Sequence, residues 1–72
     1  MVNINKLRGK MAEQGISVEA LARRLHMDRA TLYRRLETDG ENFSIREADA
    51  IARVLQLNLE EANAIFFSQF VA

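Results

Sequence analysis

Four side chains in the segment 29–34 have types and a spacing suited to contacting the edges of nucleic-acid bases. Arg29, Tyr33 and Arg34 repeat at i, i+4 and i+5, which places them with Ala30 on the outer face of a helix. An arginine guanidinium can donate paired hydrogen bonds to O6 and N7 of guanine, and an alanine methyl group can contact the methyl group of thymine. The alternative is an ordinary solvated helix face on which Tyr33 partly covers the core.

A pair of short amphipathic helices over residues 17–36 is predicted to position this face. Leu21 and Leu25 form the apolar stripe of the first helix, and Leu32 and Leu36 form that of the second, each pair at i and i+4. Because the leucines turn inward, the arginines of the second helix are left outside. A helix pair of this length with a basic outer face is typical of proteins that insert a helix into the DNA major groove.

The chain resembles the lambda-repressor-like helix-turn-helix family, the Cro and C1 type of phage and bacterial regulators. The resemblance covers about residues 4–57 and is carried by Ser17, Leu21, Ala22, Leu25, Met27, Asp28 and the T-L-Y-R-R-L run that follows. The chain is similar to short Cro-like switch proteins of phages and, in its I-F-F-x-x-F ending, to modulator-of-repression antirepressors. The resemblance implies an all-α, compact five-helix domain whose motif binds operator DNA.

Further DNA contacts are expected from Ser17, which also caps the first motif helix, and from Arg24. Weaker candidates for phosphate contacts are Lys6, Lys10, Arg23 and Arg35.

Two positions depart from the family pattern. His26 stands in the turn where the family usually has glycine, and its side chain fits a left-handed backbone less easily, so an altered turn is one expectation. Val18 stands where many relatives have a glutamine that contacts a phosphate. We therefore expect one DNA contact of the family to be missing.

Three more helices are predicted outside the motif. The first runs from about Ile4 to Gln14, with Gly15 as a C-terminal stop. Gly9 inside it costs ~1 kcal/mol relative to alanine, which suggests that another backbone packs close by. Ser44, in a capping box, begins the next helix, whose expected buried residues are Ile45, Ala48, Ile51, Ala52 and Leu55.

The C-terminal helix, over about residues 59–71 after an Asn58 cap, carries more apolar side chains than one face can hold. We expect part of this set to close the core and part to form an interface with a partner; the set is Ile65, Phe66, Phe67, Phe70 and Val71. The alternative is that Phe66, Phe70 and Ile65 only close the core, while Phe67 and Val71 are incidentally exposed.

Composition limits the class of protein. With 72 residues, 49% of them hydrophobic, and neither cysteine nor proline, the chain is expected to form one domain over residues 1–72. No apolar run reaches the ~18 residues of a membrane span, and a cytoplasmic location is expected. His26 is the only histidine, and acidic pairs fall at helix starts or turns, so we expect no enzyme activity and no cofactor.

The charges are distributed unevenly along a chain of zero net charge. Residues 1–16 carry a net charge of +2, and residues 17–36 carry five arginines against two acids, a net charge of +3. Residues 37–72 carry a net charge of −5. The motif is therefore basic and the remainder acidic.

Two functions of different classes are consistent with these features. The first is a transcriptional regulator, a repressor or activator of a phage lysis-lysogeny switch, that binds double-stranded operator DNA as a homodimer. The second is an antirepressor that forms a heterocomplex with a phage repressor and blocks its DNA-reading face. A nucleoid protein without sequence preference is a weaker alternative, because the acidic half lacks a broad basic surface.

Overall fold

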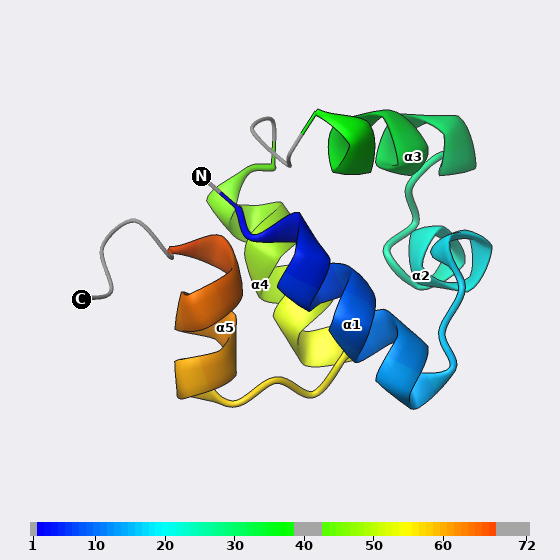
Figure 1. Cartoon of the computed structure of the whole chain (residues 1–72). Helices are drawn as coiled ribbons and strands as arrows, with labels where there is room; N and C mark the ends of the chain where they lie inside the picture. The colour runs from blue at the N-terminus through cyan, green and yellow to red at the C-terminus, as the bar shows by residue number, and fades with distance from the viewer. Residues whose placement is uncertain (1, 39–42, 68–72) are drawn as a thin grey trace.

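Polar side chains cap the start of every helix in the computed structural model, which describes residues 2–38 and 43–67 (Figure 1). The five helices of this part of the chain are α1 (Ile4–Gln14), α2 (Val18–Arg24), α3 (Arg29–Glu37), α4 (Ile45–Val54) and α5 (Leu59–Phe66). Their caps, each accepting from a backbone N–H three residues on, are Asn3, Ser17, Asp28, Ser44 and Asn58. The all-α, five-helix prediction is confirmed.

Three of the four connections between helices are the same turn. Gly15, His26 and Gln56 each follow a helix with a left-handed backbone, at φ of 68°, 56° and 54°. Each is followed by a half-buried apolar residue and then by the cap of the next helix. His26 therefore adopts the conformation of a C-terminal glycine, and the motif turn has the same form as the turn after α1.

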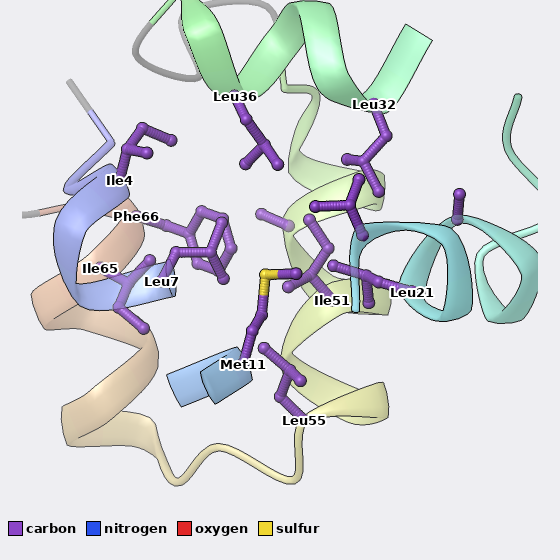
Figure 2. Packing of buried hydrophobic residues seen from close by; sticks show 13 residues of the cluster. Ile4, Leu7, Met11, Leu21, Leu32, Leu36, Ile51, Leu55, Ile65 and Phe66 are labelled. Atoms are coloured by element: carbon purple, nitrogen blue, oxygen red, sulfur yellow. The ribbon is translucent and has the colours of Figure 1, made fainter. Parts of the chain in front are cut away.

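The core lies where the apolar stripes of all five helices meet. Leu7, Leu21, Leu32, Ile51 and Leu55 are fully buried. Figure 2 shows Leu32 and Leu36 pointing from α3 toward the other helices, with side chains of α1, α4 and α5 below them. This packing fixes the rotation of α3 about its own axis, and so decides which of its residues face outward.

The ends of α1 and α5 are tied into this core by hydrogen bonds. The N–H of Asn3 donates to the carbonyl of Ile65 at 2.6 Å, and the side-chain amide of Gln14 donates to the carbonyl of Leu55 at 2.6 Å. Figure 1 shows α1, α4 and α5 grouped together, with α2 and α3 on the other side.

Three local expectations are corrected. Ile45 is 79% exposed, because it opens α4 at the margin of the helix face whose centre is formed by Ala48, Ile51 and Leu55. A β-carbon at Gly9 would meet nothing within 4 Å, so no backbone packs closely there. Helix α5 ends at Phe66, whereas the expected helix continued to residue 71; residues 68–72 lie outside the described part of the chain.

Candidate nucleic-acid interface

The outer face of α3 presents the four side chains expected to meet bases. Arg29, Ala30, Tyr33 and Arg34 are all exposed, whereas Leu32 and Leu36 of the same helix are buried. Asp28 caps the helix by accepting from the N–H of Thr31 at 3.3 Å. The first two turns of α3 therefore expose two guanidinium groups, a phenol and a methyl group.

Tyr33 is held in place on this surface by a hydrogen bond to a neighbouring helix. Its hydroxyl donates to Oε1 of Glu19 on α2 at 3.0 Å, and this hydrogen bond raises the pKa of Tyr33 above its usual value of 10.0. Arg29 on α3 and Arg8 on α1 act electrostatically in the opposite direction and lower it. The sequence did not identify Glu19 or Arg8 as neighbours of Tyr33, because they lie on α2 and α1, whereas Tyr33 lies on α3.

The two candidates on α2 occupy its opposite ends. Ser17 uses its hydroxyl oxygen to cap α2, accepting from the N–H of Ala20 at 3.1 Å, and Arg24 is exposed in the last turn. Val18, which replaces the family glutamine, is 9% exposed and belongs to the core. It cannot contact a phosphate.

Two of the weaker phosphate candidates are engaged within the protein. Arg35 forms an ion pair with Glu47 of α4, and its guanidinium lies 6.0 Å from the centre of the Phe43 ring. Lys10 forms ion pairs with Glu61 of α5 and with Glu13. The ion pairs with Glu47 and Glu61 each join two helices, whereas Lys6, Arg23 and Arg24 remain exposed.

A helix-turn-helix with this outward basic face agrees with the comparison with known families, in which residues 6–66 match the Cro/C1-type HTH DNA-binding domain. The chain belongs to this family. No curated protein and no solved structure matches it. As a Cro/C1-type domain the protein is a DNA-binding transcription regulator. None of the helices described is long and apolar enough to cross a membrane.

The apolar residues of α5 in this Cro/C1-type domain divide into two groups. Ile65 and Phe66 are 1% and 7% exposed and belong to the core, where the Phe66 ring meets that of Phe43 edge-on at 6.4 Å. They are therefore not available to a partner, contrary to expectation, because α5 turns this side toward α1 and α4. Phe67 is 40% exposed. Phe70 and Val71 lie outside the described residues.

An exposed apolar patch surrounds Phe67. A hollow of about 50 Å³ is lined by Val2, Phe43, Ile45, Phe67 and their neighbours, all without charge. We call this the Ile45/Phe67 patch. It joins the start of α4 to the end of α5, and the local sequence reasoning missed Ile45 because it assigned that residue to the core.

Proposed function

We propose that the protein regulates a phage lysis-lysogeny switch by binding double-stranded operator DNA with the outer face of α3. The exposed surface of Arg29, Ala30, Tyr33 and Arg34 carries the proposal, because guanidinium groups on an outward helix suit the acceptors of guanine in the major groove. The surrounding net charge of +3 over residues 17–36 favours approach to phosphates.

A homodimer is part of this proposal. A domain of zero net charge gains little affinity from phosphates, so two linked copies of α3 are needed for tight binding. The Ile45/Phe67 patch is a suitable contact surface, because no charge has to be buried when two copies meet there. Phe70 and Val71 are proposed to extend the same surface.

The test is a gel shift with the upstream regulatory DNA of the gene at two salt concentrations. We expect Arg29→Ala to remove the shift at protein concentrations that half-saturate the parent, since a bidentate guanine contact contributes ~1–3 kcal/mol. Arg53→Ala is the matched control, because Arg53 is an exposed arginine of α4 whose one ion pair within residues 2–38 and 43–67 is with Asp49 of its own helix. An unchanged shift with Arg29→Ala would exclude α3 from base recognition.

An antirepressor is the second candidate, favoured by one observation. The Ile45/Phe67 patch is exposed within the half of the chain that carries a net charge of −5, and an apolar anchor in acidic surroundings suits the basic DNA-reading face of another regulator. Adding the neighbouring repressor to the gel shift separates the two functions. Loss of the repressor's own shift supports the antirepressor.

The patch itself is tested by sedimentation, alone and with that repressor. Phe67→Ser should weaken association in either function. Leu59→Ser, at the other end of α5 and 77% exposed, should leave association unchanged. Equal sedimentation of the parent and Phe67→Ser would exclude the patch as an interface.

A further inference from the structure

The geometry points to Glu19 as a positioning residue that determines, through Tyr33, which base α3 selects at one position of the operator. The inference rests on the proposed binding of DNA by α3. It adds a specificity role for a residue of α2, the helix that precedes α3 in the motif.

The contact joins two helices at the surface. The Tyr33 hydroxyl and Oε1 of Glu19 are 3.0 Å apart, and both side chains are exposed. Tyr33 stands on α3, so without this bond its ring would be free to choose among rotamers toward solvent. The bond instead holds the Tyr33 ring in a rotamer that points from α3 toward the first turn of α2.

The direction of the hydrogen bond sets what the phenol can recognise. Its only proton is donated to Glu19, so the oxygen is left with acceptor capacity alone. In the major groove, adenine N6 and cytosine N4 are donors, whereas guanine O6 and thymine O4 are acceptors. A phenol held in this way favours adenine or cytosine on the strand that it contacts and disfavours guanine or thymine.

The negative charge of Glu19 affects the affinity for DNA of every sequence, and not the choice of base. A carboxylate on a surface that meets phosphates repels DNA of every sequence. Its charge therefore lowers non-specific binding, while its hydrogen bond directs base choice. The two effects are separable by substitution, because glutamine keeps an acceptor oxygen without the charge, and phenylalanine keeps the ring without the hydroxyl.

The experiment selects binding sites for the parent from a pool of randomised duplexes, then measures anisotropy on the selected duplex and its single-base-pair variants. The parent should prefer adenine or cytosine at one position by about 2- to 13-fold, the selectivity that a single hydrogen bond provides. Tyr33→Phe and Glu19→Ala should lose this preference at that position only. Glu19→Gln should keep the preference and bind all duplexes more tightly.

Other results would contradict the inference in distinguishable ways. If Tyr33→Phe and Glu19→Ala keep the base preference, or weaken binding to every duplex by the same factor, Glu19 has no positioning role. In that case the loss of the gel shift with Arg29→Ala still supports DNA recognition by α3. A parent that selects no sequence overturns the proposed function itself, and the inference with it. Thermal melting of each variant separates a loss of base choice from a loss of fold, since a purely structural contact would lower the melting temperature and leave relative preferences unchanged.

Discussion

Replacing Gly9 by alanine should stabilise the domain, whereas the same replacement at Gly15 should destabilise it. A β-carbon would meet nothing within 4 Å at either position, so available space does not distinguish them. Gly9 lies inside α1 beside an open hollow of about 400 Å³ between α1 and α5, and Gly15 ends α1 at a φ of 68°. The two variants thus differ in backbone conformation alone.

The magnitudes follow from that difference. Alanine is favoured over glycine inside a helix by about 0.8–1.0 kcal/mol, which is the expected gain for Gly9→Ala. At Gly15, a left-handed alanine costs roughly 1–2 kcal/mol. The lower entropy of the unfolded chain offsets roughly 0.4–1 kcal/mol of this. The net loss of stability for Gly15→Ala is then about 0.8 kcal/mol, the middle of a range of roughly 0–1.6 kcal/mol that the difference of these terms gives.

Urea denaturation and thermal melting of both variants provide the measurement. For a domain of this size, 1 kcal/mol corresponds to a shift of roughly 4–8 °C in Tm, so the variants should move in opposite directions by readily measured amounts. A destabilised Gly9→Ala variant would refute the reasoning, because it would mean that a neighbouring backbone needs the space that the structure leaves open. DNA binding should be unchanged in Gly9→Ala, since Gly9 lines the hollow between α1 and α5 and none of the residues that line it belongs to α3.

Two further predictions concern the turns and one ion pair. His26→Gly and Gln56→Gly should each raise stability by about 0.5–1 kcal/mol in urea denaturation, because both residues are left-handed; a loss in both would show that their side chains stabilise the turns. Glu47→Gln should cost about 1 kcal/mol at neutral pH, since glutamine can keep the capping box but not the ion pair with Arg35. The hydrogen bond from Arg35 lowers the pKa of Glu47 below 4.5, so its contribution is complete above that pH and lost as the pH falls through the lowered value. Melting curves of the parent and Glu47→Gln should therefore converge on acidification, and a difference that persists in acid would contradict this assignment.

The charged residues illustrate how far sequence reasoning reached into the site. The outward position of Arg34 follows from the leucine spacing of its own helix and is seen in the structure, where Arg29, the first residue of the helix, is exposed as well. The engagement of Arg35 with Glu47 could not be foreseen, since the two side chains come from different helices and the distance between those helices is set by the whole core. The same holds for the bond between Tyr33 and Glu19.

The sequence by itself determined where the helices start and, at Gly15, where the first one ends. Caps such as Ser44 and Asn58, and the stop at Gly15, act over three or four residues, so their effect can be recognised before any packing is known. Only the tertiary structure decided which apolar side chains are left outside. Ile65 became core and Ile45 became surface because burial depends on which neighbouring helix covers a given side, and that is a property of the assembled domain.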